Sequence, residues 1–147
     1  MTELTLAQAN KMIEAALAKA REMKLPPLAI AVMDSGGHLK ALQREDGLSF
    51  FRVQICQAKA WGAVGMAESS RKIGARTQLG PTGQGFLAAL GSLSGGMVIP
   101  VPGGVPVRDG DGNIVGAVGA SGAKSEDDET CAVAGIEAAG FAADAEG

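Results

Sequence analysis

Apolar residues near the start of the chain recur at the spacing of an amphipathic helix, at Leu6, Ala9, Ile13, Ala16, Leu17 and Ala20. Thr5 and Gln8 have the form of a capping box, which predicts that this helix begins there. Pro26 and Pro27 require it to end by Leu25, because proline disfavours helical backbone before it and cannot donate a hydrogen bond. The continuous apolar run 28–33 that follows is typical of a central strand covered on both faces.

A hairpin and a second helix are predicted next. Residues 34–37 (Asp-Ser-Gly-Gly) favour a turn, and the chain returns as a strand from His38 to Arg44. Asp46 and Gly47 end this hairpin. Helical spacing then resumes with Ser49 as the N-cap and continues to about Met66.

The middle of the chain has a weaker pattern. Residues 69–76 are a short helix or a loop, and a brief apolar segment covers residues 86–90. A glycine-rich link at 91–96 leads into a predicted strand from Met97 to Val101.

A second hairpin and a helix complete the predicted fold. Strands at about 103–107 and 114–122 flank Asp, Gly and Asn residues that favour a tight turn. Repeated glycine in the second strand indicates that a chain segment or a ligand packs close to its backbone. Ser125 is the predicted cap of a final helix to about Phe141. The order α-β-β-α-β-β-β-α gives a five-stranded antiparallel sheet packed with helices, an α+β fold in one domain over 1–147.

Composition narrows the class of protein. The chain has 147 residues with 46% hydrophobic content, which argues against disorder. It carries 13 basic and 16 acidic residues without a basic stripe, so no nucleic-acid partner is expected. The chain has no signal-peptide pattern or membrane-length apolar run, so a cytoplasmic protein without a membrane partner is expected. Cys56 and Cys131 are expected to be buried, reduced thiols.

Five side chains are candidates for chemistry. His38 is the only histidine, which excludes a multi-histidine metal site in one protomer; it is either structural or a haem-iron ligand and proton shuttle. Arg44 either pairs with a local carboxylate or recognises an anion. Lys59 is either a surface lysine or a group that binds carboxylates or propionates. Asp128 and Glu129 either complement the N-terminus of the last helix or act as general acid and base.

Six blocks together resemble the GlcG/HbpS-like family, in the order in which that family has them. They cover nearly the whole chain, from Leu4 to about Ala139, and comprise residues 29–39 (Ala-Ile-Ala-Val-Met-Asp-Ser-Gly-Gly-His-Leu), 44–47, 58–60, 103–107, 114–122 and 128–132. The resemblance implies a profilin-like or GAF-like α/β sandwich that assembles as dimers or larger homo-oligomers such as octamers. The family also includes the C-terminal domain of PduO-type corrinoid adenosyltransferases.

Haem or a related tetrapyrrole is the ligand that this resemblance favours. Some members bind haem, and some are linked to its degradation; His38 matches the histidine that is a candidate haem ligand in some of them. In this hypothesis Arg44 and Lys59 contact propionates, and the backbone at Gly103 and Gly104 lets a flat ligand approach closely. No metal besides haem iron is expected, and the sequence does not identify any cofactor other than haem.

Two alternatives remain open from the sequence. In the first alternative, the chain is an isomerase or lyase that acts on a small oxo or hydroxy acid without a metal, and His38 is the acid or base. Asp128 or Glu129 would then assist, and Arg44 or Lys59 would hold the substrate carboxylate. Otherwise the chain is an accessory subunit of a catabolic enzyme.

Overall fold

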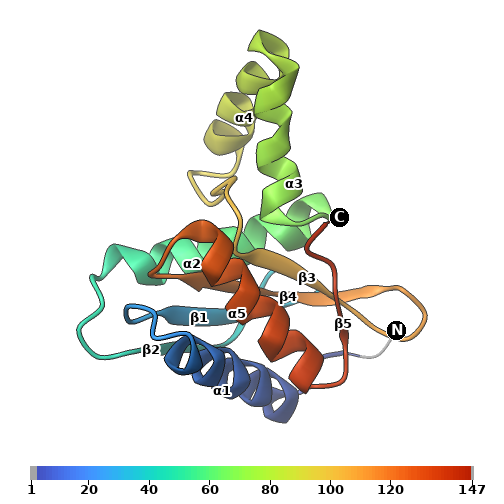
Figure 1. Ribbon diagram of the computed structural model, residues 1–147. Coiled ribbons are helices and arrows are strands. Elements are labelled where there is room, and N and C mark those ends of the chain that lie inside the picture. Colours follow the sequence, from blue (N-terminus) through green and yellow to red (C-terminus); the bar gives the residue numbers. More distant parts are fainter. Residues whose placement is uncertain (1–2, 147) are drawn as a thin grey trace.

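The structure, a computed structural model, describes residues 3–146 (Figure 1). Five strands form one antiparallel sheet in the order β2-β1-β4-β3-β5. The strands are β1 (Ala29–Asp34), β2 (Leu39–Arg44), β3 (Gly104–Arg108), β4 (Ile114–Ser121) and β5 (Ala142–Ala143). The helices are α1 (Leu6–Glu22), α2 (Phe51–Met66), α3 (Ser70–Gly74), the 3-10 helix η1 (Ala75–Leu79), α4 (Pro81–Leu93) and α5 (Ser125–Ala138). The α+β fold with a five-stranded antiparallel sheet is therefore confirmed.

The two faces of the sheet are covered by different helices, and they differ in side-chain size. Helices α1 and α5 lie side by side on one face, where Ile30, Val32 and Val118 contribute to the main core (Figure 1). Helix α2 packs on the other face against small residues such as Ala31 and Ala117. Alternation along β1 and β4 thus places large apolar groups on one side and lets α2 approach the backbone on the other.

Gly119 is where this close approach is tightest. A Cβ atom at this position would collide with the backbone carbonyl of Cys56 in α2, and the Ala60 Cβ would lie 3.0 Å from it. The glycine-rich second strand therefore accommodates a segment of the same chain, which decides between the two explanations that its sequence left open.

The ends of three helices test the predicted caps. Thr5 and Gln8 form the predicted capping box, with the Gln8 amide donating to Thr5 Oγ1 at 3.1 Å and the Thr5 amide to Gln8 Oε1 at 2.9 Å. Helix α2 begins at Phe51, after an N-cap at Phe50 that has no side-chain hydrogen bond, so the prediction of Ser49 as its cap is wrong. The last helix has Lys124 as its N-cap, so the prediction of Ser125 as its cap is also wrong. This helix ends at Ala138, before the predicted end near Phe141.

The predicted strand from Met97 to Val101 is also wrong. This segment has no strand pairing in the sheet, and Val98 instead packs over α2, where its Cγ1 atom would lie 3.3 Å from a Cβ at Gly62. The fifth strand is β5 near the C-terminus, which pairs with β3 through Val107 and Ala143. The apolar pattern identified a packed segment correctly, but hydrophobicity alone does not distinguish a strand from an irregular segment that packs on a helix.

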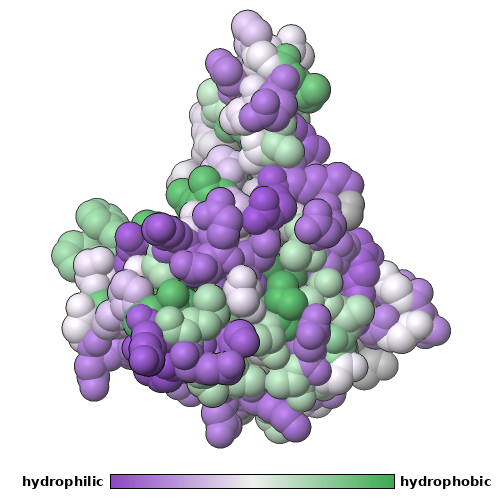
Figure 2. All heavy atoms as spheres, viewed as in Figure 1, coloured by the Kyte–Doolittle hydropathy of each residue, from purple (hydrophilic) through white to green (hydrophobic). Residues whose placement is uncertain are grey.

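An arm made of α3, η1 and α4 projects from the body of the molecule (Figure 1). The brief apolar segment in the sequence belongs to α4, which contains no charged residue over its 13 residues. Leu79, Phe86 and Leu93 are exposed on this arm. Figure 2 shows hydrophobic side chains near the tip of the arm and at its base.

Candidate functional site

His38 lies at the end of the turn between β1 and β2, and 80% of its side chain is exposed. Asp34, the last residue of β1, accepts hydrogen bonds on Oδ1 from the backbone N–H groups of Gly36 and His38, each at 2.9 Å. The Nδ1 atom of His38 is 3.2 Å from the same oxygen. Because an ionised carboxylate only accepts, a hydrogen bond between these two atoms requires a proton on Nδ1.

The protonation of Asp34 supports this arrangement. Desolvation acts to raise the pKa of Asp34, but the hydrogen bonds from the backbone N–H groups of His38 and Gly36 oppose it. Together with the hydrogen bond from the His38 side chain, they hold the pKa of this carboxyl below its usual value. Asp34 therefore remains an acceptor at neutral pH.

Trp61 connects the histidine turn to an apolar cleft. Gly37 has a φ of 80°, and a Cβ atom there would lie 3.0 Å from the indole Nε1 of Trp61. Trp61 also lines a cleft of about 170 Å³ between α2, α4 and the segment that follows α4. The other lining residues are Gly62, Gly65, Met66, Leu90, Leu93, Ser94 and Val98. The cleft is apolar and smaller than the roughly 300–1,000 Å³ of most ligand pockets.

Lys59 and Asp128 form an ion pair in the interior. The Lys59 ammonium donates to Asp128 Oδ2 at 3.2 Å and to the Ala120 carbonyl at 3.0 Å, and Asp128 Oδ1 accepts from the Ala123 amide at 2.9 Å. The side chains are 2% and 0% exposed. Burial lowers the pKa of Lys59 and raises that of Asp128, while the attraction between the two charges opposes both shifts.

Gly103 and Gly104 lie against this buried pair. A Cβ atom at Gly103 would be 2.8 Å from the Lys59 ammonium nitrogen, and one at Gly104 would collide with the Lys59 carbonyl. The Ser70 hydroxyl accepts from the Gly104 amide at 2.7 Å. The structure thus brings Lys59, Asp128 and both glycines together, with Lys59 and Ser70 packed closely against the two glycines.

Glu129 faces a different partner. Its carboxylate accepts from Arg71 in a bidentate pair, with the Nε–Oε2 distance at 3.0 Å and the Nη2–Oε1 distance at 3.1 Å. This pair joins α5 to α3 at the base of the arm. Among the contacts of residues 3–146, neither Glu129 nor Asp128 approaches His38.

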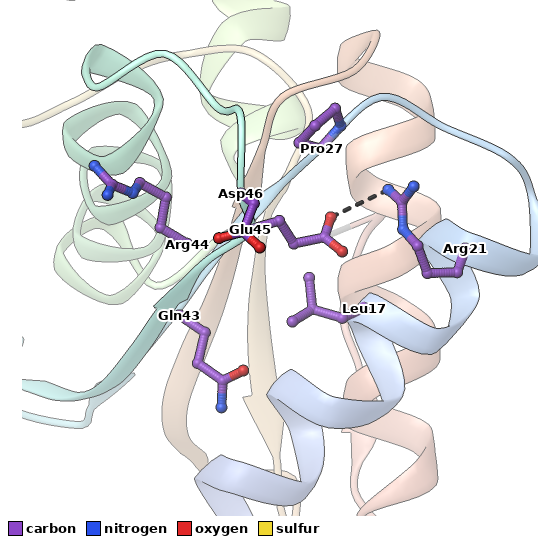
Figure 3. A pocket seen from close by; sticks show the side chains of 7 residues that line it. All are labelled: Leu17, Arg21, Pro27, Gln43, Arg44, Glu45 and Asp46. Atoms are coloured by element: carbon purple, nitrogen blue, oxygen red, sulfur yellow. Dashed lines mark hydrogen bonds and ion pairs between the residues drawn. The ribbon is translucent and has the colours of Figure 1, made fainter.

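Arg44 borders a hollow of about 340 Å³ between α1 and β2 (Figure 3). Glu45 extends across this hollow to Arg21, and its Oε1 atom accepts from Arg21 Nη2 at 3.1 Å and from the Leu28 amide at 2.8 Å. The Arg44 side chain points away from Arg21. Leu17, Pro27, Gln43 and Asp46 complete the lining. Arg44 and His38 are therefore at the two ends of the same strand, apart from the Lys59 cluster.

The comparisons with known proteins concern nearly the whole chain. The family model described as "Haem degrading protein HbpS-like" matches residues 4–137. The chain belongs to the HbpS-like family. The resemblance drawn from the sequence blocks is therefore confirmed.

Three relatives illustrate how far this HbpS-like chain matches other proteins. An uncharacterised 15.0 kDa protein of the dhaT-dhaS intergenic region of Citrobacter freundii is 31% identical over 134 residues, which are 91% of this chain and 90% of the relative. A solved PduOC–haem complex superposes with a TM-score of 0.84 at 24% identity, over 95% of this chain and 97% of the other. A double mutant of HbpS from Streptomyces reticuli has a TM-score of 0.78 at 29% identity, over 93% and 87%.

Sequence reasoning missed the partners of two candidate residues. Asp34 was assigned only to the turn, although an Asp two residues before a glycine and four before a histidine is a signal for an Asx-type turn. The pairing of Lys59 with Asp128 joins positions 69 apart in sequence, and no local pattern indicates it.

Over residues 3–146, no three His, Cys, Asp or Glu side chains gather where they could hold a metal ion. None of the helices described is long and apolar enough to cross a membrane.

Proposed function

We propose that this protein binds haem or a related tetrapyrrole, with His38 as the ligand of the iron. The observation that carries the proposal is the exposed imidazole, whose Nδ1 atom lies 3.2 Å from Asp34 Oδ1, which leaves the other ring nitrogen for a ligand. Membership of a family described as haem-degrading supports it, as does a similar fold solved in complex with haem. Imidazole is a common axial ligand of haem iron.

The residues around His38 fit such a group in part. His38 supplies a nitrogen donor, and Trp61 offers an aromatic surface beside it that continues into the apolar cleft of about 170 Å³. This cleft accommodates only an edge of a macrocycle. A tetrapyrrole would therefore lie on the surface of one protomer, held by the iron–imidazole bond and by apolar contact.

Haemin titration tests the proposal. We expect the untagged wild-type protein to give a saturable, shifted Soret band, and His38→Ala to lose it. Asn113→Ala, in the exposed turn between β3 and β4, is the matched control and should bind as the wild type does. A wild-type response as broad and unsaturable as that of free haemin would overturn the proposal, as would a His38→Ala protein with unchanged spectrum and affinity.

We further propose that the protein forms homo-oligomers through the arm. Leu93 is 85% exposed, Leu79 69% and Phe86 44%, all on an arm whose helix α4 carries no charge. Exposed apolar surface that gathers on one part of a protein is typical of a protein–protein interaction site. Light scattering with size exclusion measures the mass: the wild type should be a multimer. Leu93→Glu should reduce the mass, while Gln84→Glu places the same charge elsewhere on α4 and should not. A monomeric wild type would contradict this proposal.

A further inference from the structure

We propose that Asp34 is a positioning residue that fixes the tautomer and direction of the His38 ring, so that Nε2 is presented unprotonated to a metal centre. The consequence for haem rests on the proposed function, whereas the tautomer itself does not.

The Oδ1 atom of Asp34 collects three N–H groups. It accepts from the Gly36 amide and the His38 amide, both at 2.9 Å, and from His38 Nδ1 at 3.2 Å. The two backbone bonds fix the carboxylate relative to the turn, and the third then fixes the ring relative to the carboxylate. One oxygen therefore couples the shape of the turn to the direction of the imidazole.

Gly36 makes room for the ring in this position. A Cβ atom on Gly36 would lie 2.8 Å from Cε1 and 2.9 Å from Nδ1 of His38, closer than side chains normally approach. Gly37 has a positive φ of 80° and its backbone lies against the Trp61 indole. The glycine pair thus lets the imidazole lie along the turn and lets the turn pack closely against the Trp61 indole.

The arrangement matches what metal-binding histidines require. Such histidines usually donate their second ring N–H to a carboxylate or carbonyl, which fixes the tautomer and raises the basicity of the ligating nitrogen. Removal of such a partner commonly costs about 10–100-fold in metal affinity. Here the partner is in place in the protein alone, which distinguishes a prepared ligand from an ordinary exposed histidine.

Nitrogen NMR tests the tautomer without haem. His38 is the only histidine, so each ring-nitrogen signal of untagged, ¹⁵N-labelled protein belongs to it. At pH 9, where imidazole is neutral, we expect Nδ1 to be protonated and Nε2 to be of the pyridine type. Asp34→Ala should shift the population toward Nε2–H. A wild-type ring with Nε2 protonated would overturn the inference.

A conservative variant guards against loss of the turn. Asp34→Asn retains an oxygen for the backbone N–H groups but removes the negative charge, so the turn and the Nδ1–H tautomer should persist. Its haemin affinity should be lower than that of the wild type by about 10-fold or more. If haemin binds through His38 and both Asp34 variants bind as tightly, with unchanged Soret spectra, the inference fails. If the NMR tautomer is found and haemin does not bind, the haem function fails and the positioning role stands.

Discussion

Two carboxylates in this protein each contact a nitrogen-containing side chain, one pair in the interior and the other at the surface. Asp128 contacts Lys59 where both side chains are buried, and each partner makes a further hydrogen bond to backbone. Asp34 contacts His38 at a turn where most of the ring is exposed. The pKa shifts follow the surroundings, since burial raises the pKa of Asp128 while N–H groups lower that of Asp34.

The difference indicates which pair is available for chemistry. Both nitrogen atoms had been candidates for ligand contact, yet the Lys59 ammonium is enclosed by Ala120, Asp128 and Gly103. A buried pair of this kind holds α2, β4 and α5 together. The His38 ring has one nitrogen in contact with Asp34 and is 80% exposed, so a ligand can reach this pair from solvent.

Breaking the buried pair should have the largest effect on stability. Asp128→Asn leaves the Lys59 charge buried without an opposite charge, and we expect a loss of about 3–5 kcal/mol in the free energy of unfolding, measured by urea denaturation. Glu137→Gln, an exposed neutralisation in the same helix, should change it by less than about 0.5 kcal/mol. The double variant Lys59→Met, Asp128→Leu should recover part of the loss. Equal stabilities for Asp128→Asn and Glu137→Gln would contradict a structural role.

Alkaline pH probes the same buried region through its thiols. Burial raises the pKa of Cys56 from 9.0 to about 12 and that of Cys131 from 9.0 to about 11. Above pH 9 the unfolded thiols release protons that the folded protein retains, so the free energy of unfolding falls as pH rises. Each thiol contributes a slope of about 1.4 kcal/mol per pH unit until its folded pKa. Cys131→Ala should remove about half of this slope between pH 9 and pH 11; an unchanged slope would show that the Cys131 thiol is accessible.

Gly103→Ala tests how tightly the chain fills the space beside Lys59. Gly103 has a φ of 130°, and its Cβ would crowd the ammonium. We expect a loss of about 1–3 kcal/mol in the free energy of unfolding. Gly110→Ala, at a turn position with open space around it, is the matched control and should be neutral or slightly stabilising. Tolerance of alanine at Gly103 would mean that the interior has room for a ligand there.

Gly36→Ala should have the smallest effect on stability and a clear effect on binding. The ring of His38 is exposed and can move aside, so the free energy of unfolding should change by less than about 0.5 kcal/mol. The displaced ring would lose its bond to Asp34, and the affinity for haemin should fall. If the His38 ring is displaced and the affinity for haemin is unchanged, ligand binding does not depend on the geometry of the turn.

Which helices and strands the sequence predicts depends on whether the contacts that bury them follow a local pattern. Periodicity identified α1 and β1, because their burial follows the local alternation of side chains. It failed at Met97–Val101, a segment that contains Pro100 and packs on α2 without strand pairing. The two-residue strand β5 is too short to give a periodic signal.

The candidate site was predictable only as a set of residue types. The sequence singled out His38 and Lys59 as ligand-binding candidates, but exposure separates them, and exposure depends on contacts between distant segments. Asp128 reaches Lys59 only because α5 and α2 both meet β4. The His38–Asp34 pair is local, and it lies within a turn that the sequence did predict.

The most direct test of the account is resonance Raman spectroscopy of the reduced, untagged protein reconstituted with haem, with and without ¹⁵N-histidine. His38 is the only histidine, so an iron–nitrogen stretching band that moves to lower frequency on labelling identifies its imidazole as the ligand. We predict that shift. A stoichiometric haem complex with no isotope-sensitive iron–nitrogen band would contradict the assignment of His38, and with it the contrast drawn between the exposed and the buried pair.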